Sequence, residues 1–298
     1  MRNKVQSAIC PICNSSNTQF ALAAKDFTVS GEEFNISECK QCSFWFTQNA
    51  PDELLISNYY NSKNYISHTN SSAGLINKLY QIIRKNTICK KQKLIEKITN
   101  KGNGNLLDVG SGTGFFAGTM KKAGWNVVGI EPDENTRKLA LELNNVELID
   151  ANIFFQLLPN QFDVITLWHV LEHVHSLKPY VQKLKELLKQ DGKLVIAVPN
   201  HDCFDAKFFK QYWAAYDVPR HLYHFNFESL NLLIENEGMR LEKIKPMWFD
   251  SFYISLLSSK YKYKNTRWML ALMVGLWSNV LALIHPKRCS SLVFIFSK

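Results

Sequence analysis

The sequence has 298 residues, of which 46% are hydrophobic and 20% charged, and its net charge is +9. This composition does not suggest a disordered chain and allows one sizeable domain with a small accessory unit. The polar first residues carry no apolar signal segment, so we expect a cytoplasmic location.

Four of the seven cysteines form two Cys-x-x-Cys pairs that are separated by 25 residues. They are Cys10, Cys13, Cys39 and Cys42. Two such pairs can close a tetrahedral site of four thiolates around Zn²⁺, whereas disulfides, the alternative, are rare in a reducing compartment. Because four protein ligands leave no position for water, residues 1–50 are predicted to form a zinc ribbon with a structural metal ion.

Residues 51–101 read as a polar linker followed by a basic helix over Gly74–Thr99. Between Lys78 and Lys101 there are eight basic residues and one acidic residue. Such a run is typical of a solvated helix face, and a contact to anionic lipid or nucleic acid is the alternative.

An apolar strand from Leu106 leads into three alternating glycines, Gly110, Gly112 and Gly114, and the next strand ends at Glu131. Glycines at this position let a ligand approach bare backbone N–H groups, and a carboxylate about 20 residues later accepts hydrogen bonds from ribose hydroxyls. The spacing is Gly-x-Gly-x-Gly with Asp108 two residues ahead, not the Gly-x-Gly-x-x-Gly of dehydrogenases. The motif therefore points away from NAD.

These residues resemble the class I S-adenosylmethionine-dependent methyltransferases. After the fourth strand comes Leu171-Glu172-His173-Val174, which resembles the corresponding segment of the ubiquinone-methylase type. The resemblance covers residues 105–298 and implies an α/β, Rossmann-like, doubly wound sheet of seven strands, the last antiparallel, in a domain over 102–298. It implies S-adenosylmethionine as the cofactor. The matching positions imply a set of cofactor-binding residues: Gly110, Ser111, Gly112 and Gly114 at the methionine end, Glu131 and Pro132 at the ribose, Asp150 at the adenine, Trp168 and His169 beside the sulfonium, and Asp108 orienting the loop.

The pattern of apolar residues supports this fold. Helices are expected over 115–123, 134–143 and 177–189, and strands over 125–130, 146–149, 162–167, 193–198, 239–247 and 291–296. Strands that alternate with helices of about 10 residues indicate a parallel sheet.

A histidine-rich segment lies within residues 200–227, which we expect to form an active-site lid. His221 and His224 are the candidate general bases, because an imidazole of near-neutral pKa can take a proton from a methyl acceptor. Tyr223 is expected to orient that acceptor. Alternatively, these residues only tie the lid to the sheet through hydrogen bonds.

His169, Glu172 and His173 would share one face if their segment were helical, and two imidazoles with a carboxylate can bind a transition ion. The alternative is that both histidines are structural.

Residues 248–290 form an insertion between the last two strands, where the resemblance implies a short turn. No charged residue occurs from Trp268 through Pro286, and basic residues lie on both sides of that stretch. We expect a packed lid helix, an apolar cover for a lipophilic substrate, or a peripheral membrane contact through residues 260–286. A membrane-spanning helix is rejected, because it would leave the last strand on the wrong side.

The expected function is methylation of a small molecule, at oxygen of a lipophilic or acidic metabolite. The alternatives are a sugar C-methyltransferase, an RNA base methyltransferase and a non-catalytic cofactor-binding protein. Nucleic acid is the less expected partner, because residues 168–171 are not the Asn/Asp-Pro-Pro-aromatic tetrad of amino methylases. The oligomeric state is left open.

Overall fold

The computed structural model describes residues 4–5, 9–60 and 75–298, with side chains over 9–60 and from 86 onward. The predicted linker beyond residue 60 and the side chains at the start of the basic helix lie outside these described residues. The helix itself, α1, covers Leu75–Thr99, as predicted.

The chain divides into two compact units, and both are discontinuous in sequence. One takes residues 1–68, 171–180 and 197–294, and the other takes 69–170, 181–196 and 295–298. The cysteine-rich segment, the lid segment and the insertion thus all belong to the first unit, whereas the glycine loop belongs to the second.

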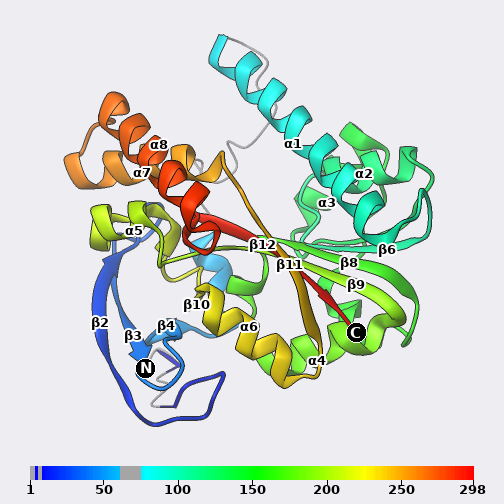
Figure 1. Ribbon diagram of the computed structural model, residues 1–298, viewed down its shortest axis with the longest axis horizontal. Helices are drawn as coiled ribbons and strands as arrows, with labels where there is room; N and C mark the ends of the chain where they lie inside the picture. Colours follow the sequence, from blue (N-terminus) through cyan, green and yellow to red (C-terminus); the bar gives the residue numbers. More distant parts are fainter. Residues whose placement is uncertain (1–3, 6–8, 61–74) are drawn as a thin grey trace. The chain divides into compact units, whose positions relative to one another are not determined.

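A small sheet in the first unit has the order β10-β4-β3-β2. Its strands are β2 (Thr18–Lys25), β3 (Glu33–Cys39), β4 (Trp45–Thr47) and β10 (Tyr223–His224). β2 and β3 form a hairpin (Figure 1). It turns at Asp26, whose carboxylate accepts hydrogen bonds from the backbone of Thr28, Val29 and Ser30. β10 comes from the lid segment and pairs antiparallel with β4. The sequence does not signal this pairing.

The rest of the first unit is mainly helical. Its elements are η1 (Ile56–Tyr59), η4 (Leu171–His173), α5 (Phe204–Phe209), η5 (Lys210–Tyr212), η6 (Ala214–Tyr216), α6 (Phe227–Asn236), α7 (Asp250–Tyr263), α8 (Trp268–Ile284) and η7 (Pro286–Arg288). The short strands β1 (Lys4–Val5) and β5 (Ala50–Pro51) pair with each other. One apolar core joins Phe34 and Ile36 of β3 to Phe209, Trp213 and Val274. The ribbon strands and the insertion therefore share a core.

The described residues contain a larger sheet of six strands in the order β11-β12-β9-β8-β6-β7. The strands are β6 (Asn105–Val109), β7 (Asn126–Ile130), β8 (Phe162–Trp168), β9 (Leu188–Pro199), β11 (Arg240–Pro246) and β12 (Ser291–Ser297). The helices α2 (Phe115–Lys122), α3 (Glu134–Asn144) and α4 (Leu177–Leu187) follow the expected pattern. β6 runs parallel to β7 and β8.

The last strand, β12, lies between β11 and β9. Met247, just after β11, donates a backbone hydrogen bond to Ser291 at the start of β12, so the two strands run antiparallel. The α/β Rossmann-like fold is thus confirmed, as a mixed sheet.

One strand differs from the prediction. The segment expected as the third strand, 146–149, contributes only a parallel bridge between Ile149 and Ile130. Val146 and Leu148 are buried against Ala117 and Ala140. Their apolar side chains account for the strand-like pattern, although a ladder does not form.

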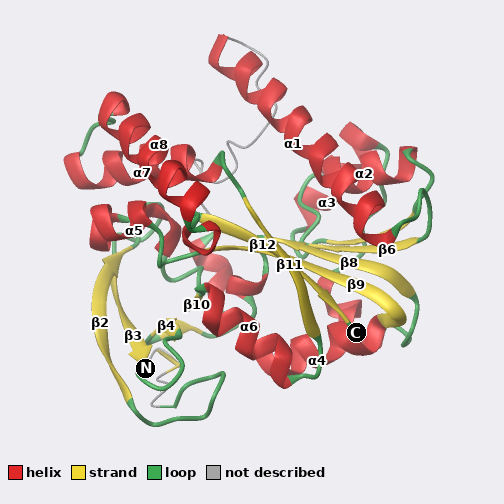
Figure 2. Ribbon diagram, in the orientation of Figure 1, coloured by secondary structure: helices red, strands yellow, loops and turns green. Residues whose placement is uncertain are grey.

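The insertion is a helical hairpin of α7 and α8 joined by a short loop (Figure 2). Gly275 permits the close approach, because a Cβ there would lie 2.9 Å from Phe252 and 3.1 Å from the carbonyl of Ser251. Among the described residues, no helix has both the length and the apolar character needed to cross a membrane.

Candidate active site

The glycine loop connects β6 to α2 in a conformation that needs glycine. Gly110, Gly112 and Gly114 have φ values of +68°, +53° and +72°, a region that L side chains rarely adopt. A Cβ on Gly110 would lie 2.4 Å from Val170, whereas nothing lies within 4 Å of one on Gly112. The backbone at Gly112 therefore faces open space that a ligand can fill.

Glu131 lies directly beside this loop. Its carboxylate accepts hydrogen bonds from the backbone N–H of Gly112 at 2.9 Å and of Asp133 at 3.2 Å. Burial raises the pKa of Glu131, and the two hydrogen bonds act in the opposite direction. A carboxylate has more acceptor positions than these two bonds use, so Glu131 can also accept from ligand hydroxyls.

Asp108 lies buried beneath the loop. Its carboxylate accepts a hydrogen bond of 2.7 Å from the hydroxyl of Thr166, and burial raises the pKa of Asp108 to about 6. Ser111 donates to the backbone carbonyl of Asp108 at 2.8 Å. These contacts hold the glycine loop in position.

At the end of β8, Trp168 packs edge-on against Phe116, and the amine of Lys91 lies 4.0 Å from its ring centre. The indole N–H of Trp168 is buried without a hydrogen-bond partner among the described residues. His169 follows with φ of +59°. An unsatisfied buried donor beside an open loop is what a bound ligand would complete.

Pro132 and Asp150, two further residues predicted to bind the cofactor, are both contacted by Arg137. Arg137 donates to the carbonyl of Pro132 at 2.7 Å and pairs with Asp150 at 2.9 Å. Asp150 also accepts from the backbone of Asn152. Both of its oxygens are thus engaged, and its role at an adenine stays a prediction.

The four cysteines predicted to bind metal come together at one end of the small sheet. Their sulfur atoms lie within 4.8 Å of one another, and Cys10–Cys42 and Cys13–Cys39 are each separated by 3.5 Å. Both pairs are built in the same way: the residue after the second cysteine has positive φ and donates its N–H to the carbonyl of the first. A tetrahedral Zn–S₄ site requires sulfur separations of about 3.8 Å, so the cluster fits the ion.

The predicted catalytic residues His221, Tyr223 and His224 lie on the segment that pairs with β4, and each has a defined partner. The Nδ1–H of His221 donates to the carbonyl of Ala215 at 2.8 Å, which leaves the Nε2 lone pair as its basic position. The hydroxyl of Tyr223 donates to the carbonyl of His175 at 2.9 Å.

His224 is held by Thr47 of β4. The hydroxyl of Thr47 donates to the carbonyl of His221 at 2.8 Å, so its oxygen accepts from Nε2 of His224 at 3.0 Å. Burial, together with His221 and His201, lowers the pKa of His224 well below its usual value. His224 is therefore a weak base.

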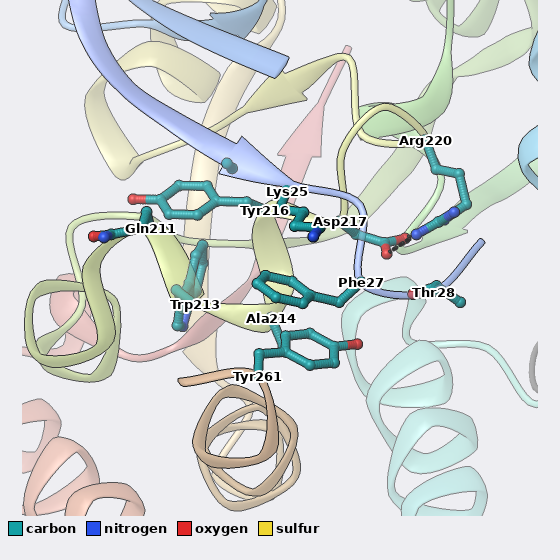
Figure 3. A pocket seen from close by; sticks show the side chains of 11 residues that line it. Lys25, Phe27, Thr28, Gln211, Trp213, Ala214, Tyr216, Asp217, Arg220 and Tyr261 are labelled. Atoms are coloured by element: carbon teal, nitrogen blue, oxygen red, sulfur yellow. Dashed lines mark hydrogen bonds and ion pairs between the residues drawn. The ribbon is translucent and has the colours of Figure 1, made fainter. Parts of the chain in front are cut away.

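Arg220 anchors the same segment and is almost fully buried. Its guanidinium pairs with Asp217 at 2.6 Å and with Asp26 at 3.1 Å, and it donates to the carbonyl of Tyr59 at 2.8 Å. Asp217, Arg220 and the side chains of Lys25, Phe27 and Tyr261 line a small pocket in this unit (Figure 3). The pocket brings the β2–β3 turn, the lid segment and α7 to one place.

The metal trio expected from the sequence differs in one member. Ligating atoms of Glu172, His173 and His221 lie within 4.8 Å of one another, and His169 is not part of this cluster. Residues 171–173 form a 3₁₀ turn and not the α-helix that would align His169 with them. Burial, with a further contribution from His221, lowers the pKa of His173 to about 4.

Thr47 and Asp26 are functional candidates that the sequence reasoning missed. Each is a common surface residue type, and each lies more than 170 residues from its partner on the lid segment. Of the two residues, only Asp26 lies in a segment, the β2–β3 turn, whose local structure the sequence indicates.

Comparison with known proteins agrees with this geometry. Residues 67–244 match a family described as "Methyltransferase domain". An uncharacterized methyltransferase of Alkaliphilus oremlandii is 29% identical over 109 residues, which is 36% of this chain and 50% of that protein. A ubiquinone biosynthesis O-methyltransferase of Actinobacillus pleuropneumoniae is 36% identical over 121 residues, again 36% of this chain and 52% of that protein. The chain spans about half the length of these curated relatives.

A solved structure shows the fold. The crystal structure of a SAM dependent methyltransferase from Archaeoglobus fulgidus matches with a TM-score of 0.50 and 18% identity, over 72% of this chain and 94% of that one. The family match covers more than half of the sequence and includes the glycine loop and Glu131. The chain therefore belongs to the methyltransferase-domain family, with the fold of the class I S-adenosylmethionine-dependent methyltransferases.

Proposed function

We propose that the protein binds S-adenosylmethionine at the glycine loop and transfers its methyl group to a small-molecule acceptor. The observation that carries this proposal is the open space at Gly112 beside the half-buried carboxylate of Glu131. Bound there, the cofactor supplies a methyl group already activated on a sulfonium.

The residues of the chain then bind the cofactor and orient it. Glu131 accepts hydrogen bonds from the ribose hydroxyls, and the backbone of the glycine loop lines the methionine end. Trp168 gains a partner for its indole N–H. Asp108 positions the loop through its backbone carbonyl and Thr166.

The acceptor atom is proposed to be oxygen. The similarity to a ubiquinone biosynthesis O-methyltransferase supports this choice, and an acidic or lipophilic hydroxyl compound fits it. An oxygen acceptor must lose its proton as the methyl group arrives, and His221 presents a lone pair on Nε2. His221 is thus the proposed general base.

Cofactor binding is tested first, by titration calorimetry with S-adenosylmethionine. Binding by the wild type, with a large loss in Glu131→Ala and none in Glu134→Ala, supports the proposal. Glu134 is a matched control because it is an exposed acid on the adjacent α3. No binding by the wild type would overturn it.

The substrate class is tested with methyl-labelled cofactor and an extract of the source cells, separated into lipid, aqueous, RNA and protein fractions. Label in the lipid or aqueous small-molecule fraction supports the proposal, and label in RNA that resists alkaline treatment overturns it. His221→Gln should lower turnover without changing cofactor affinity, whereas His285→Gln, at an exposed position just after α8, should leave turnover unchanged. Equal turnover in both variants would exclude His221 as the base.

We also propose that the four-cysteine cluster holds a structural zinc ion. All four coordination positions are then taken by thiolates, so the ion activates no water. Its role is to stabilise a ribbon too small to build a core of its own.

A further inference from the structure

The face of α8 that points away from the domain is entirely apolar. Six side chains on it, at two adjacent positions in each successive turn, are 41–63% exposed: Trp268, Met269, Leu272, Met273, Leu276 and Trp277. We call this set the α8 outer face. Soluble proteins rarely leave a contiguous apolar surface of this kind uncovered unless it binds something.

The opposite face of α8 fixes this orientation. Ala271, Val274 and Gly275 are buried, and Gly275 lies against α7. The hydroxyl of Ser278 donates to Asp205 at 2.7 Å, and that carboxylate also accepts from the indole of Trp213. Because small and hydrogen-bonded residues hold the inner face, the bulky outer residues cannot turn inward without breaking these contacts.

The apolar surface continues onto the start of α7. Asn279 of α8 donates to the carbonyl of Trp248 at 2.8 Å, which places the two helix ends side by side. Trp248, Phe249 and Tyr253 are exposed there. Figure 1 shows α7 and α8 as a paired hairpin.

The charged residues around the α8 outer face indicate which kind of partner covers it. From Ser251 to Ser290 the sequence has six Lys and Arg and no Asp or Glu. Lys260, Lys264 and Arg267 are exposed near the start of α8, and Lys287 and Arg288 are exposed just after its end. The apolar face is thus bounded at both ends by positive charge.

A second copy of the chain is a poor match for such a surface. If two α8 helices paired in parallel, each basic end would meet the same basic end, and if they paired antiparallel, each would meet the other basic end. Like charges would be brought together in both cases, whereas anionic phospholipid headgroups neutralise both ends at once.

We propose that the α8 outer face docks on the surface of an anionic lipid bilayer. At about 1.5 Å per residue the 17-residue helix is about 26 Å long, and it lies in the plane of the interface with its apolar side chains among the upper acyl chains. Trp268 and Trp277 have the amphipathic rings that favour this depth. The proposal is independent of methyl transfer, since docking needs neither cofactor nor acceptor.

The test is co-sedimentation of the full-length protein with vesicles of phosphatidylcholine, with and without 30 mol% phosphatidylglycerol, in about 0.1 M salt. The wild type should bind the anionic vesicles at least about tenfold more strongly than the neutral ones. Leu272→Glu/Leu276→Glu should reduce binding at least about tenfold. The matched control is Leu141→Glu/Leu143→Glu, which places the same charges on exposed leucines of α3 and should bind like the wild type.

Circular dichroism checks that each variant is folded, and a blue shift of tryptophan fluorescence on vesicle addition reports insertion of the face. Equal binding by the α8 double variant and the wild type would overturn the proposal. Failure of the wild type to bind anionic vesicles would also overturn it. If light scattering instead shows a wild-type dimer that the α8 variant converts to a monomer, and neither binds vesicles, the face is a subunit interface.

Discussion

Thr47→Val isolates the link between the cysteine ribbon and the histidine segment. Valine has nearly the shape of threonine but lacks the hydroxyl, which is almost fully buried and makes two hydrogen bonds to residues 174 and 177 positions away. The substitution leaves the carbonyl of His221 and Nε2 of His224 buried without these partners. Each unsatisfied group costs about 1–2 kcal/mol, so we expect a loss of about 3 kcal/mol in the free energy of unfolding.

Urea unfolding followed by tryptophan fluorescence measures this change. With a slope of about 3 kcal/mol per molar for a chain of this size, the midpoint should fall by about 1 M. Thr119→Val is the control, because the hydroxyl of Thr119 bonds only within its own helix, to Phe115, and its loss should cost less than about 1 kcal/mol. A Thr47→Val midpoint within 0.2 M (roughly 0.6 kcal/mol) of the wild type would refute the reasoning.

The other predictions concern the cofactor loop, the metal ion and pH. Gly112→Ala should weaken S-adenosylmethionine binding at least about tenfold in calorimetry, because its φ of +53° is strained for alanine and the Cβ fills the open space; an unchanged dissociation constant would contradict this. Metal analysis should find one zinc ion per chain in the wild type and none in Cys39→Ser, and equal zinc contents would contradict the four-thiolate site. The pKa of His224 is lowered by burial, so its contribution to stability is present above about pH 6.5 and is lost as the pH falls, by up to about 1.4 kcal/mol per pH unit. His224→Gln should reduce the slope of the stability profile between pH 6.5 and 5, while the slope that His173 contributes remains, and a profile parallel to the wild type would exclude this assignment.

The glycine loop and the α/β fold were predictable because their signals are local. The glycines after β6 and the carboxylate at the end of β7 lie within about 30 residues of one another, and the alternation of strands with helices is visible from one element to the next. The one error there, the strand at 146–149, arose because buried Val146 and Leu148 give the same apolar pattern in an irregular segment as in a strand.

The histidine cluster was only half predictable. The sequence placed Glu172 and His173 together, because they are neighbours, but chose His169 as the third member on the assumption of a helix. The structure supplies His221 instead, from a segment almost 50 residues later. Periodicity over three residues cannot separate a 3₁₀ turn from an α-helix.

By itself, the sequence determined the glycine loop, the four-cysteine cluster and the α/β fold, because short-range spacing and backbone preferences encode all three. Only the tertiary structure decided that the lid segment joins the cysteine ribbon through β10, that Arg220 pairs with Asp26, and which face of α8 stays exposed. A helix that is apolar all round carries no record of which side is covered. That depends on where small residues such as Gly275 and Ser278 meet α7 and Asp205, and such contacts form only when distant segments pack together.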